Sequence, residues 1–263
     1  MKYFICLAAC LLVIAGCKKS DDPDDDGKIR IVFSHRVDGN PLMLDTLVYQ
    51  TATLHKYKVT DLQYFISDII LYHDGGKQVT VIQDDGIHFV DARISSTLAW
   101  SPDDEIIPGT YDSLSFTFGI NSVKNVSNRF PNPPERDMAW PDILGGGYHY
   151  MKMNLMYKNE QAATTQPFMF HLGIGQIYSS AVPNPDSITG YVQNYFPVTL
   201  KNSFTIAEGS IRTIQISMLV DRWFDGAETF DFTDYPGGIM QYQEGMHSAC
   251  LNGHNAFTGP ILK

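Results

Sequence analysis

The sequence predicts an all-β fold, an antiparallel two-sheet β-sandwich with short helical segments. Three observations lead to this prediction. Several segments alternate apolar and polar residues with a period of two, which is typical of strands with one buried face. Clusters of Gly, Pro, Asn and Asp, such as HDGGK and IIPGTYDS, separate these segments and indicate tight turns. No long apolar stripe with helical spacing runs along the chain.

Three segments carry the clearest strand pattern. The segment 28–35, KIRIVFSH, places Ile31 and Phe33 on the same face. The same period recurs in YDSLSFTFGI at 111–120 and SIRTIQISMLVD at 210–221. These segments should pair as antiparallel strands in two packed sheets.

Two short segments are the best helix candidates. One is 58–65, and the other is 238–251, where apolar residues form one uneven face. Neither is long enough to change the fold class.

The N-terminus has the pattern of a secretory signal. Lys2 precedes an apolar run at 3–15, which is shorter than the roughly 20 residues that cross a bilayer comfortably. The sequence Ile14-Ala15-Gly16-Cys17 matches the bacterial lipobox. We therefore expect residues 1–16 to be removed as a signal peptide and Cys17 to carry lipid such as palmitate.

An acidic segment follows the lipidation site. Residues 17–27 contain five aspartates and no apolar side chain after Cys17, which predicts a flexible tether. Residues 28–263 then form a single domain, in which Cys250 is the only cysteine, so no intramolecular disulfide can form. We expect an outer membrane lipoprotein that faces the periplasm or the cell surface.

The composition restricts the partners. With 29 acidic and 19 basic residues the formal net charge is −10, which disfavours nucleic acid and anionic membrane surfaces and favours a cation. Membrane contact should come through the lipid alone. Phosphate-binding glycine loops, GxSxG elbows and HExxH helices are absent, so the sequence predicts no enzyme.

Histidine and methionine recur in two neighbouring candidate strands. The segment GYHYMKMNLMY predicts a strand with His149, Met151 and Met153 on one face, and PFMFHLG predicts another that carries His171. Pairing Tyr157 with Pro167 would place His171 opposite Met153. Imidazole and thioether together are a ligand set for copper, although strand methionines are more often core filler.

Five stretches of the chain resemble the MbnP-like copper-binding family. They are FSHRVDGNPL at 33–42, YKVTDLQYFISDIILYHDGG at 57–76, PGTYDSLSFTFGINSVKN at 108–125, MAWPDILGGGYHYMKMNLMY at 138–157 and FMFHLG at 168–173. The family includes periplasmic and surface proteins associated with methanobactin uptake and copper acquisition.

The resemblance implies a lipid-anchored β-sandwich that binds copper for capture or delivery in the cell envelope, with an outer-membrane transporter as an expected partner. It implies copper ligands at His35, His149 and His171. It also implies that Trp140 lies beside the metal, as intact indole or oxidised to kynurenine. The candidate soft ligands are Met151 and Met153, and the three glycines at 145–147 should form a turn or bulge that folds Trp140 back over the following strand.

An alternative function needs no metal. A surface lipoprotein could present aromatic side chains to a glycan, a peptide or a partner protein. The tyrosines that suggest this are Tyr148, Tyr150, Tyr178, Tyr191 and Tyr195.

Overall fold

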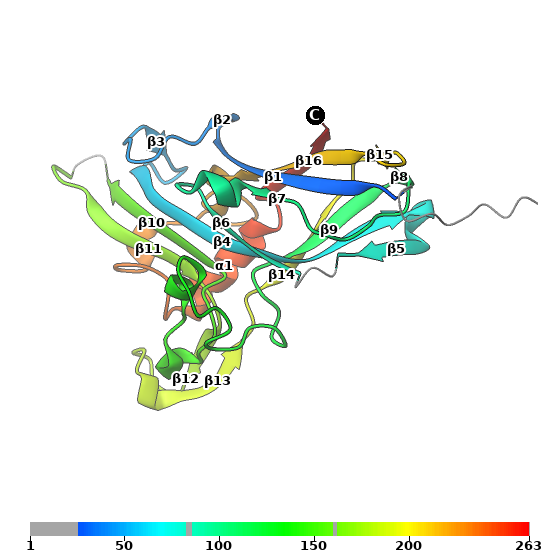
Figure 1. The fold of residues 1–263 in the computed structure, drawn as a ribbon. Coiled ribbons are helices and arrows are strands. Elements are labelled where there is room, and N and C mark those ends of the chain that lie inside the picture. Colours follow the sequence, from blue (N-terminus) through cyan, green and yellow to red (C-terminus); the bar gives the residue numbers. More distant parts are fainter. Residues whose placement is uncertain (1–25, 83–85, 160–161, 263) are drawn as a thin grey trace, which may run out of the picture.

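The computed structural model describes residues 26–82, 86–159 and 162–262, and strands are its main regular secondary structure (Figure 1). The predicted signal peptide, Cys17 and tether residues 17–25 lie outside the described residues. The strands are β1 (Lys28–Val37), β2 (Asn40–Pro41), β3 (Tyr49–Gln50), β4 (Lys56–His73), β5 (Gln78–Val81), β6 (Ile87–Asp91), β7 (Ala99–Trp100), β8 (Gly109–Tyr111), β9 (Ser113–Phe118), β10 (Met151–Lys158), β11 (Gln166–Leu172), β12 (Gly175–Tyr178), β13 (Ile188–Val192), β14 (Phe196–Leu200), β15 (Phe204–Ile206), β16 (Ile211–Leu219) and β17 (Phe257–Leu262).

Short helical segments connect the strands, as predicted. The one α-helix in the described residues is α1 (Gln243–Gly253). Single turns of 3₁₀-helix occur at η2 (Asp74–Gly76), η3 (Ser95–Leu98), η4 (Glu135–Met138), η5 (Asp142–Leu144), η6 (Pro185–Ser187), η7 (Val220–Trp223) and η8 (Phe232–Asp234).

The larger sheet is built around β4. Its central path runs β11-β10-β4-β9-β14, and β3, β5 and β6 also pair with the long β4 strand. The pairs along this path are antiparallel. Strands β11 and β10 lie at one end of this path. The face of these two strands that points away from the core can therefore carry a site.

The smaller sheet has the order β17-β16-β1-β2, with β7 added to β1. Here the purely antiparallel prediction needs one correction, because β1 and β16 pair in parallel over the whole length from Lys28 to Arg36. A parallel pair needs a long connection between its strands, and most of the chain lies between these two.

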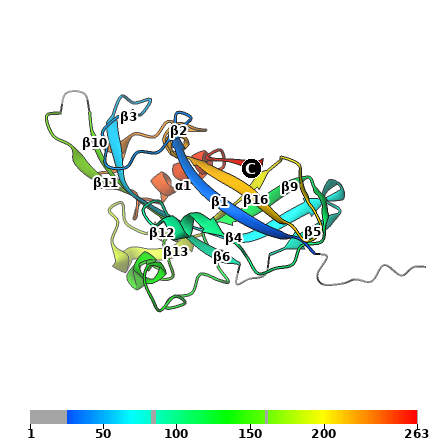
Figure 2. The same ribbon diagram turned by 45° about the horizontal axis from the view of Figure 1, so that its top comes forward.

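The two sheets enclose an aromatic core. Phe257 of β17 packs against Tyr64 of β4 and against Phe116 and Phe118 of β9, with ring centroids 5.2 to 6.5 Å apart. In Figure 2, β1 and β16 cross in front of β4. Two packed sheets with this core confirm the predicted all-β, sandwich-like class.

Both helix predictions need correction. Residues 58–65 belong to β4, where the buried Val59 and Leu62 are three residues apart because Thr60 and Asp61 both point outward at a β-bulge. The bulge therefore imitates helical spacing. The C-terminal helix begins at Gln243 rather than at 238, since the preceding segment pairs with β11 through the bond from Ile239 N–H to the Met169 carbonyl.

No helix among the described residues is both long and apolar enough to cross a membrane.

Candidate metal centre

The triple glycine forms the turn that returns Trp140 to the following strand. Gly145, Gly146 and Gly147 have φ values of 117°, 69° and 78°, in the left-handed region where a side chain is strained. The turn closes with a bond of 2.8 Å from the Trp140 N–H to the Gly147 carbonyl. The predicted turn is confirmed, and it brings Trp140 beside His149.

His149 is held by the backbone of the preceding segment. Its Nδ1 lies 2.9 Å from the Met138 carbonyl, which also accepts a bond of 2.8 Å from the His149 N–H. Because a carbonyl can only accept, Nδ1 must carry the proton and the Nε2 atom keeps its lone pair. The backbone thus fixes the tautomer of this buried imidazole.

His171 lies on β11 and is fixed by a side chain. Its Nε2 atom lies 2.8 Å from the amide oxygen of Asn154, so Nε2 carries the proton. The Nδ1 atom is buried and has no hydrogen-bond partner. A buried lone pair without a protein partner is costly, and an ordered water or a metal ion could satisfy it.

The two imidazoles lie side by side and neutral. Their ring centroids are 5.1 Å apart with the planes at 84°, and each residue is 6% exposed. Burial, with a smaller contribution from the nearby Lys152 ammonium, lowers the pKa of His149 to about 4. Burial, followed by the neighbouring His149 and Lys152, lowers the pKa of His171 to about 3. At neutral pH no proton needs to leave before either nitrogen can bind a metal.

Trp140 packs against His149. Its ring centroid is 4.6 Å from that of His149 at an interplanar angle of 70°, and its Nε1–H donates to the Leu144 carbonyl. Gly173 lets the indole approach β11, because a Cβ atom there would lie 2.5 Å from the ring. Trp140 and His149 are therefore in contact, and their position beside a metal stays a prediction.

The predicted patch of imidazole and thioether does not form. The β10–β11 register pairs Tyr157 with Gln166 and His171 with Lys152, one residue away from the prediction. A shift by one residue reverses the face, so His171 shares its face with Lys152 and Asn154 while Met151 and Met153 point into the core. The methionines are core residues, as their strand position also allowed.

His35 lies on the other side of the larger sheet. Its Nε2 atom is 3.1 Å from the hydroxyl of Tyr64, a core residue that pairs with Met151. Since Tyr64 and Met151 face the core and His171 faces away from it, the sheet separates His35 from the pair. Within the described ranges no three His, Cys, Asp or Glu side chains form a group that could hold a metal ion.

The donor set fits copper, the metal that the sequence resemblance implies. Imidazole binds copper in either oxidation state, and metal-bound histidines usually donate their second ring N–H to an oxygen. His149 and His171 both commit one ring N–H to an oxygen, and the Nδ1 atom of His171 has no hydrogen-bond partner. Copper held there would supply a Lewis-acidic cation to an otherwise neutral, buried pair.

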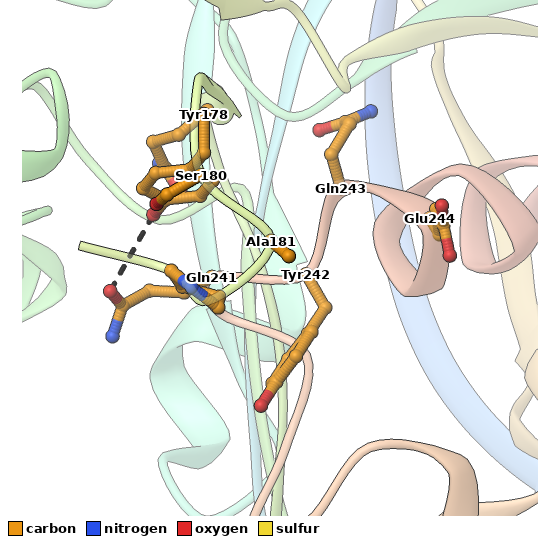
Figure 3. A pocket seen from close by; sticks show the side chains of 9 residues that line it. Tyr178, Ser180, Ala181, Gln241, Tyr242, Gln243 and Glu244 are labelled. Atoms are coloured by element: carbon orange, nitrogen blue, oxygen red, sulfur yellow. Dashed lines mark hydrogen bonds between the residues drawn. The ribbon is translucent and has the colours of Figure 1, made fainter. Parts of the chain in front are cut away.

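A separate pocket lies next to this centre. It has a volume of about 310 Å³ and is lined by Gln176, Tyr178, Ser180, Ala181, Pro183, Gln241, Tyr242, Gln243 and Glu244. Figure 3 shows these side chains from the β12–β13 hairpin and from the start of α1, with the Tyr178 hydroxyl bonded to Gln241. Gln176 joins pocket and centre, because its amide donates to the Leu144 carbonyl that Trp140 also uses.

The tyrosines of the alternative function divide into two groups. Tyr148 and Tyr150 are buried, which corrects the expectation that they face a ligand. Tyr178 lines the pocket, Tyr191 is 49% exposed on β13, and Tyr195 is half-buried with its ring against that of Tyr150.

Sequence reasoning missed the residues that orient the pair. Asn154 and Lys152 fell on the predicted strand face opposite His149, and Asp61 fell in a predicted helix. The adjacent polar residues Thr60 and Asp61 within an otherwise alternating strand were the available signal for the bulge.

The fold and the site together define an all-β, sandwich-like protein with a buried pair of neutral imidazoles. The family model for MbnP matches residues 26–241, so the chain belongs to the MbnP family. Membership indicates a methanobactin-associated, copper-related protein.

A solved structure, MbnP from Methylosinus trichosporium, has a similar fold. The TM-score is 0.50 at 16% identity, and the match covers 78% of this chain and 79% of that chain. A comparison with curated proteins found no match.

Proposed function

We propose that this protein binds one copper ion through His149 Nε2 and His171 Nδ1 and captures or delivers it in the cell envelope. The observation that carries the proposal is the pair of adjacent, buried, neutral imidazoles whose other ring nitrogens are already committed to oxygen acceptors. Family membership supports copper as the metal. Binding, rather than catalysis, is the role that we assign to the pair.

The proposal is tested by metal analysis and calorimetry on the purified mature chain. Copper should bind with a stoichiometry near one, and His171→Ala should abolish binding because one of two protein ligands is lost. His35→Ala is the matched control, since His35 is an equally buried histidine on the far side of the sheet. Identical melting temperatures and spectra for metal-free and copper-treated wild type would remove the basis for the proposal.

The same proposal includes a lipid anchor on Cys17 and an outer-membrane location that faces the periplasm or the surface. The lipobox and the acidic tether support it. Cys17→Ser should release the protein from the membrane fraction, whereas Cys250→Ser should not. A transporter in the same membrane is the partner that we propose for delivery, and copper-dependent cross-linking to an outer-membrane protein would test it.

A second candidate function uses the pocket beside α1. Its lining of glutamine amides and tyrosine rings, with Glu244 as the single carboxylate, suits the hydroxyl groups and apolar faces of an uncharged saccharide. NMR titration with a panel of neutral oligosaccharides tests this function. Gln241→Ala should weaken binding and Tyr191→Ala, outside the pocket lining, should not; shifts that do not map to the pocket would reject it.

A further inference from the structure

His171 is the end of a hydrogen-bonded chain that crosses three strands. Asn154 accepts from His171 Nε2 with its amide oxygen, and its Nδ2 donates to the Asp61 carboxylate at 3.2 Å. Asp61 in turn accepts from Arg93 Nε, also at 3.2 Å. The residues therefore run in the order Arg93, Asp61, Asn154, His171.

The direction of each bond in this chain is fixed. A carboxylate can only accept, so the Asn154 amide must point its NH₂ group at Asp61 and its oxygen at His171. The oxygen in turn requires a proton on His171 Nε2. The lone pair is then confined to Nδ1, the buried nitrogen that has no partner.

Strand register explains why these residues meet. Asn154 lies directly opposite Asp61 on β4, and it pairs with Met169 on β11, which makes His171 its diagonal neighbour on the same face. Diagonal neighbours lie roughly 7–8 Å apart, within reach of long side chains. The chain of bonds thus follows from the pairing of β4, β10 and β11.

The β-bulge in β4 is the feature that recruits Asp61. Pairing shifts between Asn154, opposite Asp61, and Leu155, opposite Val59, so that Thr60 is the extra residue. If β4 had no bulge, strict alternation of its side chains from Val59 onward would turn Asp61 toward the core. The Thr60 carbonyl accepts from Arg93 Nε at 3.0 Å, which anchors Arg93 at the bulge.

We propose that Asn154 and Asp61 are positioning residues that fix His171 in the Nε2–H tautomer, so that Nδ1 is presented to the metal. The functional role of this tautomer rests on the proposed copper binding, but the first test of the tautomer needs no copper. Partners of this kind usually affect metal affinity by about 10- to 100-fold.

The first readout needs no metal. Long-range proton–nitrogen NMR correlations distinguish the two neutral tautomers of His171 in the metal-free protein. Wild type should contain the Nε2–H form alone. Asn154→Leu, which keeps the volume and removes the acceptor, should give a mixture, and Asn154→Asp, which keeps the acceptor, should restore the single form.

A matched pair of variants distinguishes the loss of the Asp61–Asn154 bond from a general weakening of the Arg93 contacts. Asp45 and Asp61 both bind Arg93, but only Asp61 reaches Asn154. Asp61→Leu should release the Asn154 amide and mix the tautomers, whereas Asp45→Leu should leave them unchanged. The variants Asp61→Leu and Asp45→Leu also test the positioning role if Asn154→Leu fails to fold.

Copper titration is the second readout. Asn154→Leu should lower copper affinity about 10- to 100-fold, and Asn154→Asp should recover it. A single Nε2–H tautomer in both Asn154→Leu and Asp61→Leu would overturn the positioning role, even if copper affinity fell. If wild type bound no copper while the tautomers responded as expected, the copper function would fail and the positioning of His171 would stand.

Discussion

The imidazole rings of His149 and His171 lie nearly perpendicular, with centroids 5.1 Å apart, although the two residues belong to different structural elements. His149 precedes β10 and is fixed by the Met138 carbonyl, whereas His171 lies within β11 and is fixed by Asn154. Two independent oxygen acceptors therefore fix the tautomers of two neighbouring imidazole rings. This convergence is what makes the pair a candidate metal centre rather than two structural histidines.

Stability should fall in mild acid. The pKa values of His35 and His149 lie at about 4 and that of His171 at about 3, all below the ordinary 6.5 because burial penalises the charged form. Between pH 6.5 and about 4 the unfolded chain binds protons that the folded protein does not, so the free energy of unfolding decreases as the pH falls. Each group contributes at most about 1.4 kcal/mol per pH unit.

Denaturant unfolding at several pH values measures this slope in metal-free protein. The variant His35→Gln removes a titrating group and keeps a donor for the Tyr64 hydroxyl. Its slope in this window should be shallower than that of wild type. An unchanged slope would show that His35 does not titrate as its burial requires.

Trp140 should report copper binding by its fluorescence. Copper bound at His149 would lie close to the indole, whose ring centroid is 4.6 Å from the imidazole, and should quench its emission. Trp140→Phe should remove most of the quenching and leave the stoichiometry near one. The lost Nε1–H bond to Leu144 should cost about 1 kcal/mol of stability.

Trp100→Phe is the control for this measurement, because Trp100 stacks on His88 instead. Mass spectrometry of the peptide that contains Trp140 should precede it, since an oxidised indole would change both mass and emission. Quenching that survives in Trp140→Phe and disappears in Trp100→Phe would place the copper elsewhere.

Lys152 should weaken the binding of cations at the pair. It is the cross-strand partner of His171, and its ammonium lowers the pKa of both histidines. Lys152→Gln should increase copper affinity about 3- to 10-fold, more for divalent than for monovalent copper, because Coulomb repulsion scales with the charge of the ion. Competition titrations in both oxidation states measure the difference.

Lys158→Gln is the matched control on the same face of β10, six residues and roughly 20 Å further along the strand. It should leave affinity unchanged. Equal effects of the two substitutions would mean that overall charge, rather than the position of Lys152, controls binding.

The triple-glycine turn should tolerate no side chain at Gly147. A Cβ atom there would lie 2.6 Å from the Asn125 side chain, which holds the Tyr148 N–H, and φ is 78°. We expect Gly147→Ala to lower the free energy of unfolding by about 2–3 kcal/mol. Gly39→Ala, at φ 77° with open space around it, isolates the backbone strain and should cost only about 1 kcal/mol.

Thermal or denaturant unfolding of both variants measures the two costs. A Gly147→Ala variant as stable as Gly39→Ala would show that Asn125 moves aside without penalty.

Much of the fold could be predicted because its local patterns are strong. The alternation in 28–35 and 210–221 predicted the strands that form β1 and β16, but their parallel pairing joins segments far apart in sequence and has no local signal. The helix predicted at 58–65 failed because the bulge at Thr60 imitates helical spacing.

The sequence by itself predicted a turn or bulge at the three glycines 145–147 that folds Trp140 back over the next strand, since glycine adopts turn backbones without strain. It also placed His171 on a neighbouring strand. Only the tertiary structure decided which side chains meet. A register shift by one residue turned His171 away from Met151 and Met153, the sheet separated it from His35, and the bulge brought Asp61 to Asn154. The reason is physical: side chains alternate with a period of two, so the face that a residue occupies depends on strand pairing, which packing across the whole domain sets.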